Sequence, residues 1–72
     1  AREADYRVLS RRKADCEYFL GNGNRHERYL YYGSAEKHCQ EMENLWNSFS
    51  DEDKPEWLTL EQIQDYTARM VG

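Results

Sequence analysis

The sequence predicts an all-α fold: a small three-helix domain with one extra helical turn and an irregular or short extended aromatic connector. Three stretches without Gly or Pro repeat their apolar residues every three or four positions, the period of a helix that buries one face. Cap residues precede two of these stretches. The 72 residues, of which 39% are hydrophobic, are enough for one domain with a single core.

The first helix is expected over Glu3–Leu20. Its apolar stripe consists of Tyr6, Leu9, Cys16 and Leu20, widened by Val8 and Phe19. Gly21 and Gly23 follow and are expected to take the left-handed backbone that closes a helix. Residues 24–33 hold an aromatic run between charged residues, and an irregular or extended connection is favoured there over a single helical turn.

Ser34 is the expected N-cap of a second helix that ends near Ser48, with Glu36 favourably placed in its first turn. The buried stripe of this helix is Ala35, His38, Met42, Leu45 and Phe49, with Cys39 and Trp46 beside it. Residues 50–54 predict one more helical turn, which begins at Ser50 and is ended by Pro55.

The third helix opens at Thr59, because Gln62 stands three residues later and completes the capping-box pattern. Its buried stripe is Leu60, Ile63, Thr67 and Met70, with Tyr66 alongside. We assign Trp46, Phe49 and Trp57 to the core. On this assignment the change Trp57→Ala opens a cavity and costs about 3–5 kcal/mol.

Residues 1–72 are expected to form a single helical domain. The chain begins at Ala1 without an initiator Met, which suggests a domain taken from a larger multidomain protein. Two cysteines are too few to staple a secreted scaffold, and neither a signal peptide nor a membrane span of about 20 apolar residues is recognisable. These features favour the cytoplasm and predict no membrane partner.

Three motifs together resemble one known family. They are residues 16–25 (Cys-Glu-Tyr-Phe-Leu-Gly-Asn-Gly-Asn-Arg), 45–49 (Leu-Trp-Asn-Ser-Phe) and 54–59 (Lys-Pro-Glu-Trp-Leu-Thr). The chain resembles, from about Tyr6 to Met70, the domain associated with large polyvalent proteins that is the eleventh type of its series. One departure is Leu30-Tyr31, where the family has Leu-Trp.

The resemblance implies a place inside long multidomain proteins of conjugative elements and phages, mainly of Gram-positive bacteria. Such proteins are thought to act in the recipient cell and to help the element establish itself there. Together with the small size, which leaves little room for a catalytic pocket, this favours a non-enzymatic interaction or accessory domain. Its partner would be another protein or a neighbouring domain of the parent chain.

No catalytic residue, metal ligand or cofactor is predicted. Cys16, His26, His38 and Cys39 lack the paired spacing of structural zinc ligands. Cys16 lies on a buried stripe, where a thiol stays protonated, so a Cys-His nucleophile pair is not favoured. Residues 21–23 follow a helix and lack the Lys and Ser/Thr of a phosphate-binding loop, so helix termination is the better interpretation.

The predicted binding residues lie in and beside the aromatic connector. They are Arg25, Arg28, Tyr29, Tyr31 and Tyr32. A basic face of the first helix, made of Arg7, Arg11, Arg12 and Lys13, extends toward them. Cations interleaved with aromatic rings suit a single-stranded nucleic acid. We favour instead half-buried tyrosines, with arginines that pair in solvent with Glu3, Asp15, Glu17 or Glu27.

A second candidate surface is acidic. The net charge is −4: residues 1–33 contribute +2 (seven Lys/Arg, five Asp/Glu) and residues 34–72 contribute −6 (three and nine). This charge argues against tight duplex binding. An acidic surface can imitate DNA phosphates and inhibit a defence enzyme, although most acidic helix faces only keep a protein soluble. The residues concerned are Glu36, Glu41, Glu43, Asp51, Glu52, Asp53 and Glu56.

Overall fold

Three α-helices and one 3₁₀ turn account for the regular structure of residues 2–71, the part of the chain that this computed structural model describes. The elements are α1 (Glu3–Leu20), η1 (Glu27–Tyr29), α2 (Ala35–Ser48) and α3 (Leu60–Val71). The described residues contain no strand. The all-α fold class and the bounds expected for the three helices are therefore confirmed.

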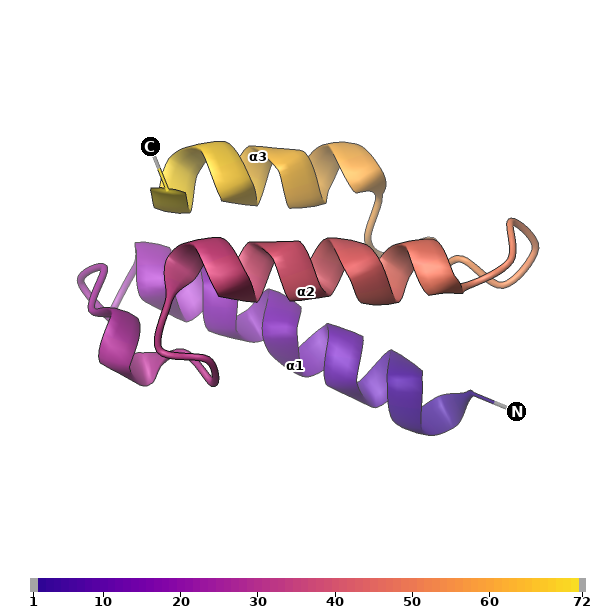
Figure 1. Ribbon diagram of the computed structural model, residues 1–72, viewed down its shortest axis with the longest axis horizontal. Coiled ribbons are helices and arrows are strands. Elements are labelled where there is room, and N and C mark those ends of the chain that lie inside the picture. Colours follow the sequence, from indigo (N-terminus) through magenta and orange to yellow (C-terminus); the bar gives the residue numbers. More distant parts are fainter. Residues whose placement is uncertain (1, 72) are drawn as a thin grey trace.

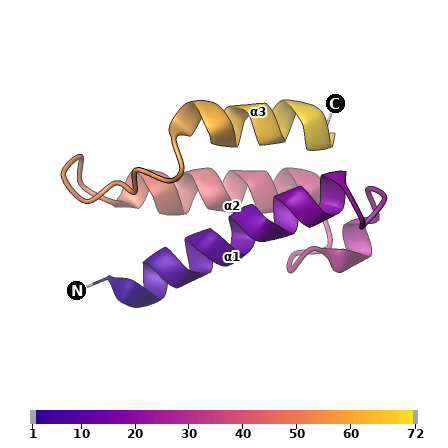
Figure 2. The same ribbon diagram turned by 180° about the vertical axis from the view of Figure 1, so that it is seen from behind.

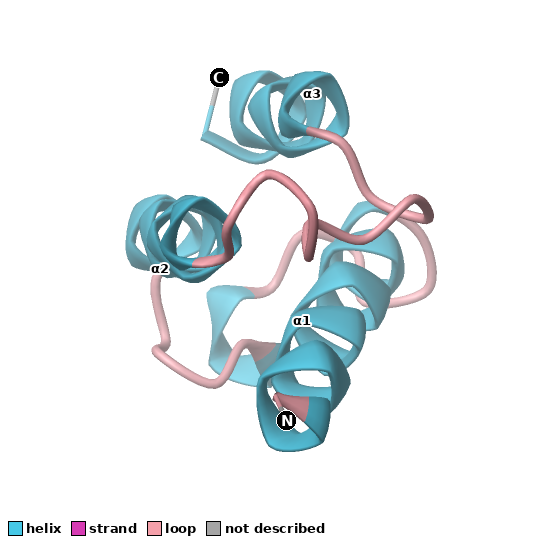
Figure 3. Cartoon of the chain, turned by 90° about the vertical axis from the view of Figure 1, so that its right-hand side faces the viewer, coloured by secondary structure: helices cyan, strands magenta, loops and turns pink. Residues whose placement is uncertain are grey.

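The helices form one bundle around a common interior. Helices α2 and α3 lie side by side and run in opposite directions, while α1 crosses α2 obliquely (Figure 1). Seen from behind, α1 lies in front of α2 (Figure 2). The end-on view places the three helices at the corners of a triangle, with loops closing the ends (Figure 3). None of the helices within residues 2–71 is long and apolar enough to cross a membrane.

The core draws on every helix and on both long connections. Its buried apolar residues are Leu9, Cys16, Phe19, Leu30, Ala35, Cys39, Met42, Phe49, Leu58, Ile63 and Met70. The predicted stripes supply most of this set, but Val8 is 41% exposed and does not widen the α1 stripe. A buried face shared by three helices is the main source of stability in so small a domain.

Two caps start their helices as the sequence predicts. The Ser34 hydroxyl accepts a hydrogen bond from the Lys37 amide at 3.3 Å and so begins α2. At α3 the capping box closes in both directions: the Gln62 amide donates to Thr59 Oγ1 at 3.2 Å, and the Thr59 amide donates to Gln62 Oε1 at 2.8 Å. These bonds satisfy amides that a helix N-terminus leaves without partners.

The end of α1 differs from the prediction for the two glycines. The residues with left-handed backbone are Asn24 (φ 53°) and Arg25 (φ 62°), whereas Gly21 has φ −113°. Gly23 serves a different purpose, because its amide donates to the Tyr18 carbonyl and a Cβ there would lie 2.8 Å from that oxygen. Gly23 is therefore needed for close approach, and the left-handed geometry falls on the next two residues.

The connector between α1 and α2 combines both conformations considered for it. His26 and Leu30 have extended backbone, while Glu27–Tyr29 form the 3₁₀ turn η1 between them. The favoured extended or irregular interpretation was therefore incomplete. The turn expected over residues 50–54 is present, because the Asp53 and Lys54 amides donate to the Ser50 carbonyl at 3.0 and 3.1 Å.

The assignment of Trp57 to the core was wrong. Its side chain is 44% exposed, whereas the neighbouring Leu58 is fully buried. Trp46 anchors this connection from α2, since its indole Nε1 donates to the Leu58 carbonyl at 2.9 Å and its ring lies 4.9 Å from the Lys54 ammonium. Phe49 is buried as predicted and stacks on Tyr6 with ring centroids 4.7 Å apart.

Candidate interaction surface

The connector that carries the predicted binding residues is fixed to the bundle at two points. Leu30 is buried in the core, and the Glu27 carboxylate accepts a hydrogen bond from the Ala35 amide at 2.7 Å. The carboxylate therefore also helps to cap α2. With Leu30 turned inward, Tyr29 and Tyr31 on either side of it stay at the surface, 47% and 72% exposed.

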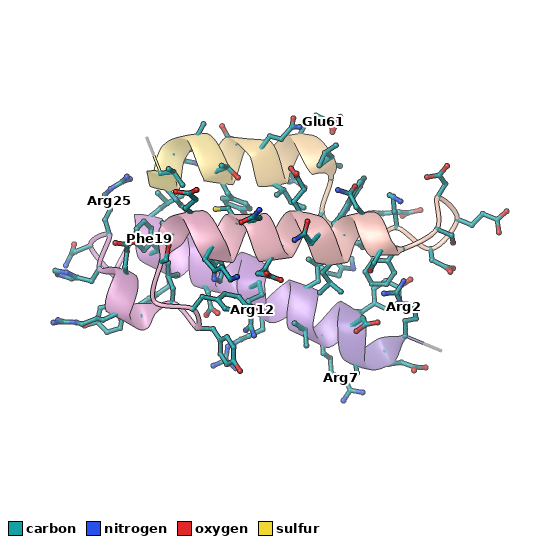
Figure 4. All side chains as sticks on the ribbon, viewed as in Figure 1. Arg2, Arg7, Arg12, Phe19, Arg25 and Glu61 are labelled. Atoms are coloured by element: carbon teal, nitrogen blue, oxygen red, sulfur yellow. The ribbon has the colours of Figure 1, made fainter. Side chains whose placement is uncertain are left out.

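One group of rings gathers over α1 around Arg12. The Arg12 guanidinium lies 4.3 Å from the centre of the Tyr31 ring and 5.6 Å from that of Tyr32, and the two rings meet edge to face at 5.0 Å. The Arg12 side chain is only 15% exposed, so the rings cover it. In Figure 4, Arg12 lies between α1 and the connector. This cation–π contact holds an exposed aromatic ring in place.

A second group lies beside the end of α1. Tyr18 and Tyr29 pack edge to face at 5.5 Å, and the Arg28 guanidinium lies 5.2 Å from the Tyr29 ring. Tyr18 is 46% exposed and was not among the predicted binding residues. We call the two groups together the aromatic patch, which consists of Arg12, Tyr18, Arg28, Tyr29, Tyr31 and Tyr32.

Arg25 is not part of the aromatic patch. Its guanidinium donates to the Met70 carbonyl at 3.1 Å and lies 5.6 Å from the Phe19 ring. In Figure 4 it stands at the end of the bundle, above the connector. A cation at the carboxyl end of α3 satisfies a carbonyl that the helix leaves without a partner, so Arg25 joins the first loop to α3.

Most of the basic face of α1 is neutralised within the domain. Arg11 and Arg12 approach Asp15 at 3.7 and 3.8 Å, and Lys13 contacts Glu17 at 2.9 Å. This bond is the main reason why the pKa of Glu17 is lowered. Arg7 points away from the bundle in Figure 4. The expected pairing with Asp15 and Glu17 is confirmed, but Arg12 is covered and does not pair in solvent. The expectation of half-buried tyrosines was wrong for Tyr31, which is 72% exposed.

The acidic residues do not gather on one surface. Glu41 pairs with Lys37 at 3.6 Å, whereas Glu36 and Glu43 line a depression between α2 and α3. The acidic residues at positions 51–53 belong to the turn after α2, beyond its carboxyl end. The acidic residues predicted as a second candidate surface, which we call the acidic sector, are therefore divided between different parts of α2 and the turn that follows it.

Comparison with known proteins gives the same family as the sequence motifs. A family model described as large polyvalent protein-associated domain 11 matches residues 2–70. The chain belongs to this family. No curated protein and no solved structure matches it. In this polyvalent protein-associated domain, motif 16–25 forms the end of α1 and its turn, 45–49 ends α2, and 54–59 leads into α3.

A buried histidine lies beneath the aromatic patch of the polyvalent protein-associated domain. His38 is fully buried and its Nε2 lies 2.9 Å from the Arg12 carbonyl, so this nitrogen carries the hydrogen and donates. Nδ1 has no hydrogen-bond partner among the described residues. The centroids of the His38 and Tyr32 rings lie 6.3 Å apart. Burial lowers the pKa of His38, and the nearby Arg12 charge acts in the same direction.

We expect His38 to make the domain less stable as the pH falls. In the unfolded chain a histidine takes up a proton near pH 6.5, while the lowered pKa keeps folded His38 neutral to lower pH. Below about pH 6.5 the unfolded state binds more protons, so the free energy of unfolding decreases. Urea unfolding between about pH 7 and pH 5 should show a shallower dependence in His38→Gln than in the wild type. The exposed His26 supplies the control. If His26→Gln, and not His38→Gln, made the pH dependence of the unfolding free energy shallower, His38 would not be the origin of that dependence.

The cysteines lie where the sequence placed them, in the core on facing helices. Cys16 of α1 and Cys39 of α2 are 0% and 2% exposed, and both are unpaired thiols. Within residues 2–71, no group of three His, Cys, Asp or Glu side chains is placed to hold a metal ion.

Proposed function

We propose that this polyvalent protein-associated domain is a non-enzymatic interaction module that binds a protein partner, or a neighbouring domain of its parent chain, through the aromatic patch. The observation that carries the proposal is Tyr31, which is 72% exposed although Arg12 holds its ring. A large ring that is exposed and already ordered loses little side-chain entropy when a partner covers it.

Arg28 indicates the chemistry of the partner. It is exposed, lies over Tyr29, and has no carboxylate within ion-pair distance among the described residues, unlike Arg11 and Arg12. A partner that brings an apolar or aromatic side chain to the tyrosines and a carboxylate to Arg28 would satisfy both groups. Arg and Tyr are the residue types that dominate binding energy at protein interfaces.

Two other functions have weaker support. A single-stranded nucleic acid needs a row of available cations, and Arg11, Arg12 and Lys13 already pair with acidic neighbours. An acidic inhibitor of a defence enzyme needs one continuous acidic face, which the divided acidic sector does not offer. The full burial of Cys16 and His38 supports a non-enzymatic role, because a substrate could not reach either side chain.

Family membership supports a proposal about the proteins in which this domain acts. We place the domain in polyvalent proteins of conjugative elements or phages, mainly of Gram-positive bacteria. In this setting it would act in the cytoplasm of the recipient cell, where a partner engaged by the aromatic patch would help the element to become established.

Photocrosslinking tests where the partner binds. A photoreactive residue at position 31 of the polyvalent protein is expected to give one discrete product with a partner or a neighbouring domain. The same residue at position 64, which is exposed on α3, is the matched control and is expected to give none. Similar products from both positions would count against the aromatic patch.

Affinity then measures the contribution of the patch. In the purified complex, Tyr31→Ala with Arg28→Ala is expected to weaken binding by at least about tenfold, since exposed Tyr and Arg anchors carry most interface energy. Because both side chains are exposed, the melting temperature of the free domain should change little. An unchanged dissociation constant in the folded double variant would rule out this surface.

A further inference from the structure

All four sulfur atoms of the sequence meet in the core. The chain has two cysteines and two methionines. Cys16 Sγ of α1 lies 3.3 Å from Met42 Sδ of α2, and Cys39 Sγ of α2 lies 3.7 Å from Met70 Sδ of α3. Cys39 and Met42 stand three residues apart on the buried face of α2, which joins the two pairs into one sulfur cluster. Each of the four residues is at most 3% exposed.

These distances suit ligands that share one metal ion. Two sulfurs bound to the same ion at about 2.3 Å with tetrahedral geometry lie roughly 3.8 Å apart. The sulfur–sulfur separations within the two Cys–Met pairs, 3.3 and 3.7 Å, lie within about half an ångström of this value. The sulfur ligands come from all three helices, whose arrangement around one interior is visible end-on in Figure 3.

The ligand types select the ion. Thiolate and thioether are soft ligands that favour Cu(I), whereas Ca²⁺ and Mg²⁺ require oxygen ligands. Structural zinc sites are built from Cys, His and carboxylates and not from Met. We propose that the sulfur cluster of Cys16, Cys39, Met42 and Met70 binds one Cu(I) ion.

A route from solvent leads to one of the ligands. Cys39 lines a surface depression of about 250 Å³ between α2 and α3, together with Glu36, Gln40, Glu43 and Thr67. The two carboxylates raise the local concentration of cations in front of the thiol. This proposal also gives a role to two residues of the acidic sector that had no other assignment.

The thiols can release their protons as the ion binds. Each thiol that binds gives its proton to solvent and copper stays in the +1 state, so that its charge offsets one of the two thiolate charges and the loaded site has a net charge of −1.

The sequence spacing could not reveal this site. The search for paired ligands along one segment is suited to zinc, and it leaves methionine out. Here, the cluster depends on how α1 and α3 pack against the residues three apart on α2, Cys39 and Met42.

Titration with Cu(I) tests the proposal. The reduced protein, without oxygen, is titrated with the acetonitrile complex of Cu(I) in competition with a chromophoric Cu(I) chelator. We expect about one ion per chain, ultraviolet absorption from thiolate-to-copper charge transfer, and a higher melting temperature with the ion bound. Zn(II) is expected to give no comparable stabilisation. Failure to withdraw Cu(I) from the chelator would overturn the proposal.

Variants that keep the core volume identify the ligands. Met42→Leu with Met70→Leu removes both thioethers in a swap that cores usually tolerate, and should weaken Cu(I) binding by at least about tenfold. Ile63→Leu, a similar swap in the same core without sulfur, should leave the affinity unchanged. Unchanged affinity in the double Met variant, or binding that persists in Cys16→Ala with Cys39→Ala, would show that the ion binds elsewhere.

Discussion

Replacing Leu58 with alanine is expected to lower the free energy of unfolding by about 2–5 kcal/mol, the usual cost of removing a large apolar side chain from a packed core. Leu58 is fully buried and lies between the turn after α2 and the start of α3. Its carbonyl also accepts the hydrogen bond from the Trp46 indole, so a local shift would disturb that contact. A loss of this size is a large part of the total stability of a 72-residue domain.

Urea unfolding followed by circular dichroism measures this loss, with Trp57→Ala as the control. Trp57 is larger than Leu58 but 44% exposed, so we expect its replacement to cost less than about 1 kcal/mol, as for most surface changes. A larger loss for Trp57→Ala than for Leu58→Ala would contradict the assignment of Leu58, and not Trp57, to the core.

The sequence does indicate that Leu58 is buried. The indication comes from its position before the N-cap of α3 and not from the size of its side chain. In a capped helix, the apolar residue before the N-cap often packs on the fourth helical residue, an arrangement called the hydrophobic staple. With Thr59 as the cap, these positions are Leu58 and Ile63, and both are fully buried. Aromatic content suggested Trp57 instead, because size says how much area a side chain can bury but not which way it points.

The helices themselves were predictable because their signals are local. Ser34 and the Thr59–Gln62 pair fix two helix starts through bonds to residues three positions away. Apolar spacing then determines the buried face once the start is known. Val8 was assigned wrongly because it lies at the margin of the apolar stripe of α1. Which marginal residues are buried depends on how α1 packs against α2 and α3.

The aromatic patch was predictable only in part, because it is made by contacts between distant segments. Tyr29, Tyr31, Tyr32 and Arg28 were recognised from their run along the connector. Arg12 and Tyr31 are nineteen positions apart in the sequence, and nothing local shows that the guanidinium lies under the ring. In the same way, only the tertiary fold turns Arg25 toward the Met70 carbonyl and away from the tyrosines.

The turn after α1 was misjudged for a related reason. Two glycines around Asn22 are typical of a left-handed helix end, yet the chain gives that backbone to Asn24 and Arg25. Asn tolerates it because its short polar side chain can bond locally, and the Arg25 amide is held by the Phe19 carbonyl at 2.8 Å. Gly23 is then free to approach Tyr18 as closely as a residue without Cβ allows.

Gly23→Ala is expected to destabilise the domain by about 1–3 kcal/mol, the usual cost of overpacking. The new Cβ would lie 2.8 Å from the Tyr18 carbonyl oxygen and 3.0 Å from Cδ2 of its ring. The ring can rotate away, but the carbonyl belongs to the last turn of α1 and cannot. Because Tyr18 packs on Tyr29, we also expect displacement within the aromatic patch, visible as changed ring contacts in NMR spectra.

Gly33 is a comparison position at which a substitution causes backbone strain but no steric clash. It has φ +70° with nothing within 4 Å of a built Cβ, so Gly33→Ala should cost about 1 kcal/mol through strain alone. Asparagine tolerates that backbone, so Gly33→Asn is expected to recover part of the loss. Gly23→Asn should recover nothing, because any Cβ meets the Tyr18 carbonyl. Equal recovery at both positions in urea unfolding would mean that strain, and not contact with α1, requires glycine at position 23.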